Sequence, residues 1–242
     1  MFESEGERID WLIEQVEGRG SNTTVPPLDP QDIEVFHITA SWLARCTSLT
    51  KGLLVLVRDR LYEPAGVVHR SSWELWIDWK YLLRVGNRRL NAAKVLLSAQ
   101  IGTLEFTDFH HDAFDSGYLE RLHQNLLDFE SRHPEASAEV RQQRRKRYFH
   151  WSGLTYSRME RELAGEPGIY GALSWEVHGT VSPMRDVQLD VSDNAAFFRF
   201  GQTEETYRPD FLLFSVGGVL FHVYNDFADM WGLQPIEFRK SR

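Results

Sequence analysis

The segment from Gly66 to Val85 constrains the fold more than any other part of the chain, because it has helical spacing but almost no polar face. Its apolar side chains cover nearly the whole circumference of the predicted helix: Trp73, Leu75, Trp76, Ile77, Trp79, Tyr81, Leu82 and Leu83. A helix that is apolar nearly all round is normally buried at the centre of a domain. Other helices must therefore pack around this one.

Most of the remaining chain also has the spacing of helices. The expected helices cover about 29–62, 90–109, 117–131, 134–163, 167–179 and 209–231. Proline marks several of their starts and glycine several of their ends, as is typical of helix boundaries. Together these segments predict a helical bundle.

One segment near the C-terminal helix departs from the helical pattern. Apolar and polar residues alternate from Val187 to Val191, and Ser192-Asp193-Asn194 then turns the chain into Ala196–Phe200. Such alternation on either side of a polar turn predicts a β-hairpin. The expected fold class is therefore mostly α, a helical bundle with one small β-hairpin insertion near the C-terminal helix.

The first 27 residues are expected to form a separate element. An apolar stripe at helical spacing predicts a short helix over residues 3–18, and its members are Ile9, Leu12, Ile13 and Val16. Glycines and a polar run that ends in Pro26-Pro27 then break the helix. We therefore divide the chain into an N-terminal helix with a flexible tether, residues 1–27, and a single helical-bundle domain, residues 28–242.

The composition excludes several classes of protein. The single cysteine, Cys46, rules out an internal disulfide framework and a multi-cysteine zinc site, in keeping with a reducing cytoplasm. The formal charge of -8 means that nucleic acid could be held only by a local basic patch. The N-terminus lacks the features of a signal peptide, and the apolar stretch Phe211–Phe221 is far shorter than the roughly 20 residues of a spanning helix. We expect a cytoplasmic protein with no membrane partner.

Charged side chains interrupt the apolar surface of the predicted central helix. Arg70 and Glu74 lie four residues apart on one face, and Asp78 follows one turn later. Buried charges have to be paired, because each unpaired one costs several kcal/mol. The group is therefore either an internal salt bridge or a functional site that faces a cleft.

A second polar stripe is expected on the helix over residues 167–179. Tyr170, Ser174 and His178 are spaced four residues apart and share one face. His178 falls at the C-terminal end of the helix, where the dipole favours its protonated form. Such a histidine can act as an acid or base near neutral pH, and the alternative is a capping histidine beside hydrogen-bonded core hydroxyls.

These two stripes carry a family resemblance. The first resembles the "R-S-hydrophobic-hydrophobic-E, then Y-L" helix of the bacterial domain-of-unknown-function family DUF5677, through Arg70-Ser71-Ser72-Trp73-Glu74, Ile77, Tyr81 and Leu82. The second resembles the "Y, L-S, then H-G" signature of the same family, through Tyr170, Leu173-Ser174 and His178-Gly179. The resemblance covers about residues 48–233. Its outline is similar to abortive-infection and HEPN-type helical proteins, and this implies the activity of many of them, metal-independent RNA cleavage.

The HEPN resemblance directs attention to a basic run. HEPN ribonucleases use an arginine followed four to six residues later by a histidine, and Arg144 or Arg145 with His150 has this spacing. The polar residue that usually follows the arginine is absent here. The candidate RNA contacts in this run are Arg141, Arg144, Arg145 and Arg147. A solvated helix face is the alternative for such a charge run. Arg70 together with His178, far apart in the chain, would be a second way to bring an arginine and a histidine together for RNA cleavage.

A third polar group suggests a metal site. On a helix, one face would carry Asp108, His111, Asp112 and Asp115. These ligand types suit a divalent metal. The neighbouring Gly117 and aromatic residues favour solvated polar side chains at a helix end instead. We therefore expect no metal site here.

Three hypotheses follow from the sequence. The first is a HEPN-like bacterial defence protein or toxin, a metal-independent ribonuclease in which Arg70 binds the scissile phosphate, Glu74 orients it and His178 acts as acid or base. The second is a non-catalytic helical module for interaction or dimerisation, and the third is a metal-dependent hydrolase that uses His111 and Asp112. The expected partners are RNA and a second copy of the chain. No phosphate-binding loop, nucleophile elbow or His-Glu-x-x-His motif occurs, so no cofactor is expected.

Overall fold

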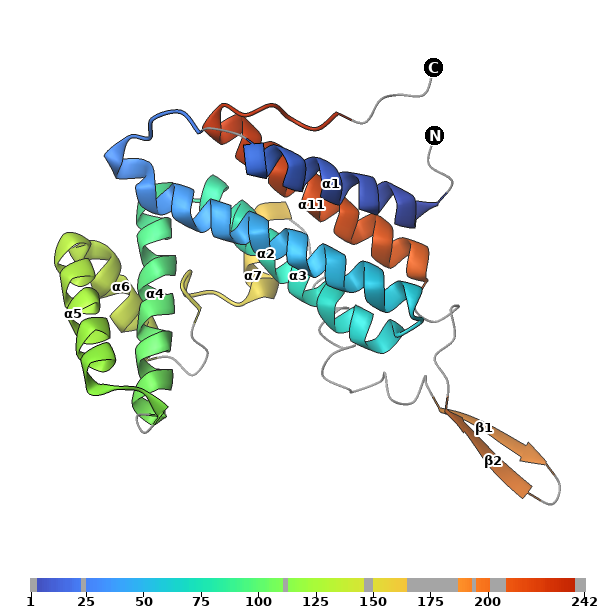
Figure 1. Ribbon diagram of the computed structural model, residues 1–242. Helices are drawn as coiled ribbons and strands as arrows, with labels where there is room; N and C mark the ends of the chain where they lie inside the picture. The colour runs from blue at the N-terminus through green and yellow to red at the C-terminus, as the bar shows by residue number, and fades with distance from the viewer. Residues whose placement is uncertain are drawn as a thin grey trace.

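The computed structural model describes residues 4–22, 25–110, 113–145, 150–164, 187–192, 195–200 and 208–237. Within these ranges, helices account for more than half of the whole chain, which confirms the prediction of a mostly α fold (Figure 1). The helices are α1 (Glu5–Asn22), α2 (Ile33–Arg58), α3 (Tyr62–Arg84), α4 (Arg88–Phe109), α5 (Ser116–Arg132), α6 (Pro134–Arg144), α7 (Tyr156–Ala164) and α11 (Pro209–Trp231). A short 3-10 helix, η1 (Pro30–Asp32), precedes α2.

Helix α3 occupies the centre of the main core, as its apolar circumference predicts. It packs against α2, α11 and α7, and the Trp79 and Leu82 side chains are fully buried. Pro64 lies in the first turn of α3 and does not stop the preceding helix, which already ends at Arg58. A proline fits there because the first turn of a helix needs no backbone N–H donor.

Helix α1 is part of the same core. Its predicted apolar stripe is buried, and it packs along α11 (Figure 1). The two helices approach closely at Gly217, where an added Cβ would lie 2.2 Å from the Ile9 Cδ1 atom. The domain boundary expected at residue 27 stays a prediction.

Helices α4, α5 and α6 form an arm beside the main body (Figure 1). Helix α4 packs against α2 on one side and against α5 and α6 on the other. The arm has a small core of its own, made of Ala93, Leu97, Leu126, Phe129, Ala136 and Val140.

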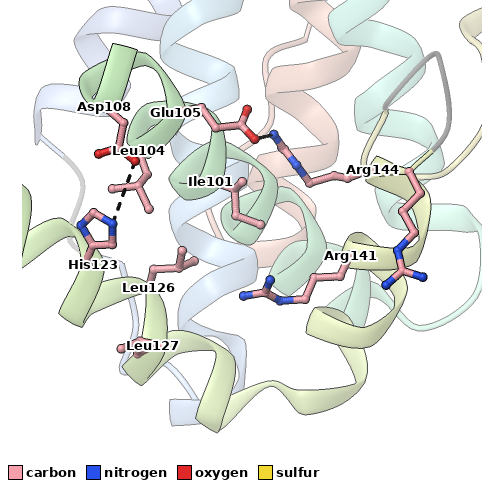
Figure 2. A pocket seen from close by; sticks show the side chains of 10 residues that line it. Ile101, Leu104, Glu105, Asp108, His123, Leu126, Leu127, Arg141 and Arg144 are labelled. Atoms are coloured by element: carbon pink, nitrogen blue, oxygen red, sulfur yellow. Dashed lines mark ion pairs between the residues drawn. The ribbon is translucent and has the colours of Figure 1, made fainter. Parts of the chain in front are cut away.

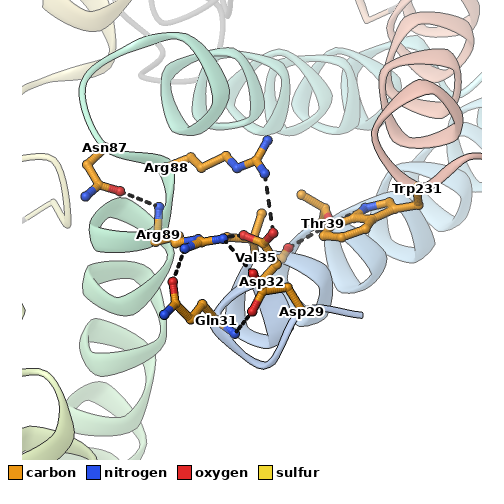
Figure 3. A network of polar contacts seen from close by, with 9 residues as sticks. All are labelled: Asp29, Gln31, Asp32, Val35, Thr39, Asn87, Arg88, Arg89 and Trp231. Carbon is orange, nitrogen blue, oxygen red and sulfur yellow. Dashed lines mark hydrogen bonds and ion pairs between the residues drawn. The ribbon is translucent and has the colours of Figure 1, made fainter. Parts of the chain in front are cut away.

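A polar network attaches the arm to the start of α2 (Figure 3). The Arg89 Nε atom donates to Asp32 Oδ1 at 2.8 Å, and Arg88 also pairs with Asp32. The hydrogen bond from Arg89 holds the pKa of Asp32 below its ordinary value. Asp29 caps η1 by accepting from the Gln31 backbone N–H, and Gln31 in turn accepts from Arg89. The N-terminal ends of α2 and α4 are thereby fixed to each other.

The single helix predicted over residues 134–163 is wrong. Helix α6 ends at Arg144, and α7 does not begin until Tyr156. Between them Trp151 is buried, and Gly153 takes a positive φ of 75° that favours glycine. Burial of the Trp151 side chain against α3 outweighs the helical propensity of the sequence around it.

Two strands lie in the segment for which a hairpin was expected. Strand β1 (Val187–Ser192) runs antiparallel to β2 (Ala195–Phe200), with Val187 opposite Phe200. The turn residues and the surroundings of the strand side chains lie outside the described residues, so a hairpin inserted into the bundle stays a prediction. The helix expected over residues 167–179 also lies outside them.

Helix α11 is confirmed with its predicted bounds, and Gly232 ends it in a left-handed conformation. By length and composition it could cross a membrane, which on its own is weak evidence. In this structure it packs against α1, α2 and α3 and contributes a large part of the main core.

Candidate functional site

A polar stripe runs along the face of α3 that carries Arg70, Glu74 and Asp78. The Arg70 Nε atom donates to Glu74 Oε1 at 2.9 Å, and both side chains are largely buried. The structure therefore confirms the ion pair that the spacing predicts.

Asp78 is the most heavily bonded carboxylate of this stripe. It accepts hydrogen bonds from Trp151 Nε1 at 2.9 Å and from the Tyr156 hydroxyl at 3.0 Å. His150 Nε2 lies 3.0 Å from the same carboxylate, whose side chain is 14% exposed. Three donors from one short segment thus converge on a single acceptor on the central helix.

His150 is held on both sides of its ring. The contact with Asp78 favours a proton on Nε2. Nδ1 then accepts from the Ser152 hydroxyl, whose Oγ lies 2.7 Å away. Ser152 Oγ also accepts the Leu154 backbone N–H at 3.2 Å, so this serine belongs to the turn that leads into α7. The histidine has the support that an acid or base requires: a fixed tautomer and a second nitrogen turned away from the carboxylate.

Helix α7 covers the same face of α3. Trp73 Nε1 donates to Glu160 Oε1 at 2.8 Å, and the Tyr81 hydroxyl donates to Glu162 Oε2 at 3.0 Å. Burial, together with the neighbouring Glu162 carboxylate, raises the pKa of Tyr81 to about 12. The polar groups of this face therefore mainly form hydrogen bonds between α3 and α7.

The predicted catalytic residues fall into two groups. Arg70 and Glu74 lie together on α3. Tyr170, Ser174 and His178 lie outside the described residues, so the expected approach of His178 to Arg70 stays a prediction. Asp78 and His150 each stand out in the sequence, but nothing in the sequence links them, because a contact between residues so far apart in the chain leaves no periodic signal. The burial of Trp151 directly after His150 is the feature that brings this segment to α3.

The arginines of the basic run are only partly solvated. Arg141 binds Glu130 through two hydrogen bonds of 2.7 Å, and this contact lowers the pKa of the Glu130 carboxyl. Arg144 pairs with Glu105 of α4. Arg145 is exposed and has no ion-pair partner among the described residues, whereas Arg147 lies outside them. The basic run is therefore not a uniformly solvated helix face, because two of its arginines are held in ion pairs.

The acidic group proposed as a metal site is divided. Asp115 caps α5 by accepting the Tyr118 backbone N–H at 2.8 Å, and His111 and Asp112 lie outside the described residues. Within the part of the chain that the structure describes, no three His, Cys, Asp or Glu side chains are grouped to hold a metal ion.

Comparison with known sequences gives the family. The model of a family described as "Family of unknown function (DUF5677)" matches residues 36–196, which is more than half of the chain. The chain belongs to the DUF5677 family. The DUF5677 match contains the polar stripe of α3, the arm and the segment with His150, and it leaves α1 and α11 outside. No curated protein and no solved structure matches this sequence.

Proposed function

We propose that this protein is a metal-independent ribonuclease of the HEPN type, which acts in the bacterial cytoplasm as a defence protein or toxin. The observation that carries the proposal is the contact of 3.0 Å between His150 Nε2 and Asp78. His150 follows Arg144 and Arg145 at the spacing of the HEPN motif. A histidine fixed by a carboxylate suits acid–base chemistry on a phosphodiester, and Arg70 on the same face of α3 is the candidate for the positive charge.

The reaction needs no metal ion if side chains supply the proton transfers and the positive charge. The 2′-hydroxyl of RNA loses a proton and attacks the phosphorus, the bond to the 5′-oxygen breaks, and that oxygen gains a proton. The products are a 2′,3′-cyclic phosphate and a free 5′-hydroxyl. His150 exchanges one of these protons through Nδ1, and His178 is the candidate for the other. Arg70 stabilises the phosphate charge, and Glu74 orients Arg70.

Asp78 is a positioning residue in this scheme. It fixes the Nε2 proton of His150, so that Nδ1 is the nitrogen offered to a substrate. The His150 side chain is 17% exposed, and Ser152 Oγ occupies its Nδ1. The Ser152 backbone N–H also donates to Nδ1, at 3.3 Å. Substrate binding therefore requires the turn at Ser152 to open, in addition to rotation of its hydroxyl.

A matched pair of variants tests the assignment. His150→Gln and Tyr156→Phe each affect one contact with Asp78, but only the first removes a group that exchanges protons. We expect His150→Gln to lower RNA cleavage by about 10²–10⁴-fold, whereas Tyr156→Phe keeps most of it. Cleavage is followed on labelled RNA in the presence of EDTA, and growth arrest on expression gives a second measurement. A parent protein that cleaves no RNA, or a His150→Gln protein as active as the parent, would refute the proposal.

The alternative function is a non-catalytic module for interaction or dimerisation, and an exposed group of rings favours it. At the tip of α4, Phe106 and Phe109 are 58% and 79% exposed, and both rings contact His110. Large exposed aromatic side chains are typical of binding surfaces. If the protein is a homodimer through this tip, Phe106→Asp with Phe109→Asp should produce a monomer in light scattering without unfolding it. A parent protein that is already monomeric would exclude a homodimer.

A further inference from the structure

A pocket of about 520 Å³ opens between α4, α5 and α6 (Figure 2). Ile101 and Leu104 of α4 and Leu126 of α5 point toward one another and form its apolar floor. Arg141 and Arg144 extend over it from α6. Arg145 also lines the pocket. The pocket thus combines an apolar surface with a cationic edge.

We propose that this pocket binds one unpaired nucleotide of a single-stranded RNA, with the base on the apolar floor and the adjoining phosphate on Arg145. This inference rests on the proposed function and adds to it a subsite for the substrate. The subsite lies on the arm and is separate from the His150 contact on α3.

The size and chemistry of the pocket favour an unpaired base. Its volume lies within the range of small-ligand sites, which is about 300–1,000 Å³, and it is lined on one side by carbon atoms. A base presents a flat apolar face only when it is unstacked, and proteins read such bases in single strands, loops and ends. A base inside a duplex cannot reach a pocket of this kind.

The phosphate is assigned to Arg145 because the other two arginines are neutralised. Arg141 is bound through two nitrogens to Glu130, and Arg144 is paired with Glu105. Arg145 is exposed, and it forms no ion pair with any residue that the structure describes, so its N–H groups can bind a phosphate. In a chain with a formal charge of -8, one such unneutralised cation beside an apolar floor is a local feature that attracts an anion.

Asp108 fixes the direction in which a nucleotide enters, because Glu105, the other carboxylate of the pocket, is paired with Arg144. Asp108 and His123, 4.0 Å apart, lie at the end of the pocket away from Arg144 (Figure 2). A phosphate would be repelled by Asp108, so it belongs at the α6 end. The Asp108 carboxylate can accept from the amino group of adenine, cytosine or guanine, or from the N3–H of uracil, so each of the four bases offers it a donor.

The test measures binding of labelled RNA by fluorescence anisotropy. The probes are a ten-nucleotide oligo(A), an oligo(U) of equal length and a duplex of the same size, each with the full-length protein. Arg145→Glu should weaken oligo(A) binding about tenfold or more, because a charged hydrogen bond is replaced by repulsion. Arg45→Glu is the matched control, since Arg45 is exposed on α2 outside the pocket, and it should change binding by less than about twofold, as expected of a distant screened charge.

A second variant tests the apolar lining of the pocket. Leu127 lines the pocket and is 58% exposed, so Leu127→Asp should leave the protein folded and weaken oligo(A) binding. Equal loss from Arg145→Glu and Arg45→Glu, or duplex bound as tightly as oligo(A), would overturn the nucleotide subsite. Unchanged RNA binding by Leu127→Asp, together with a change from oligomer to monomer, would make the pocket a protein interface instead.

The His150→Gln protein separates this inference from the proposed function. It should bind oligo(A) as the parent does while failing to cleave RNA. Cleavage that depends on His150 but not on Arg145 leaves the function standing and removes the subsite. Binding that depends on Arg145, in a parent protein that cleaves nothing, keeps the subsite and removes the ribonuclease.

Discussion

The polar face of α3 and the arm of α4, α5 and α6 both carry a buried carboxylate, but the groups that bind it are exposed to different degrees. Asp78 accepts from its three donors with only 14% of its side chain exposed. In the arm, the Glu130 carboxylate is similarly buried, with 13% of its side chain exposed, but its partner Arg141 is 58% exposed. Loss of Asp78 would leave three donors without their acceptor, whereas loss of Arg141 would leave Glu130 with the Ser137 hydroxyl as a donor.

The largest effect is expected at Asp78. Asp78→Ala leaves three donors on the 150–156 segment without their acceptor, at roughly 1 kcal/mol each. We expect the free energy of unfolding to fall by about 3 kcal/mol, measured by urea denaturation. If the loss stays below about 1 kcal/mol, Asp78 contributes no more to the free energy of unfolding than the ion pairs of the arm do.

The pH dependence of stability should also separate the two regions. His69 of α3 is fully buried against Ser215, and burial lowers its pKa to about 4 from 6.5. Because the unfolded chain takes up the proton first, His69 destabilises the fold increasingly as the pH falls below 6.5, by about 2 kcal/mol at pH 5.

Denaturation curves at several pH values measure this effect. His69→Gln should remove that part of the loss between pH 6.5 and 5, whereas His123→Gln in the arm serves as the control for deleting a histidine. A pH dependence that is the same for His69→Gln and the parent would show that His69 is not buried in its neutral form.

A smaller effect on stability is expected at Gly153, in the non-helical segment between α6 and α7. Gly153 has a positive φ, and a Cβ there would lie 2.6 Å from the Gln143 side chain. Gly153→Ala should therefore cost roughly 1–2 kcal/mol, measured as a lower urea midpoint. A stabilised Gly153→Ala protein would mean that this segment is helical, as the sequence pattern first predicted.

The smallest effect is expected in the arm. Arg141→Gln removes an arginine whose side chain is 58% exposed, and the Ser137 hydroxyl still donates to the Glu130 carboxylate. The loss should stay below about 1 kcal/mol, and the difference from the parent should shrink as salt is added. Chemical denaturation by urea at low and high ionic strength provides the measurement. A salt-independent loss as large as that of Asp78→Ala would show that the arm depends on this pair for its fold.

Much of the helical architecture could be predicted from local patterns. The spacing of apolar residues identified α3 as central and placed α11 between Pro209 and Trp231. The same method failed over residues 134–163, where a charged helical pattern continues through Trp151 and Gly153. Periodicity reports the preference of each segment for a helix, and it does not register a side chain that gains more by packing against a distant helix.

The features of the candidate site also fall into two groups, those predicted from the sequence and those seen only in the tertiary structure. The sequence by itself determined the helical class, the buried position of α3, the pairing of Arg70 with Glu74 and the resemblance to DUF5677, because each of these rests on residues close together in the chain. Only the tertiary structure decided that His150 meets Asp78, that Arg141 and Arg144 are neutralised by Glu130 and Glu105, and that the arm encloses a pocket. The physical reason is that these contacts join different elements, and their geometry is set by how the helices pack.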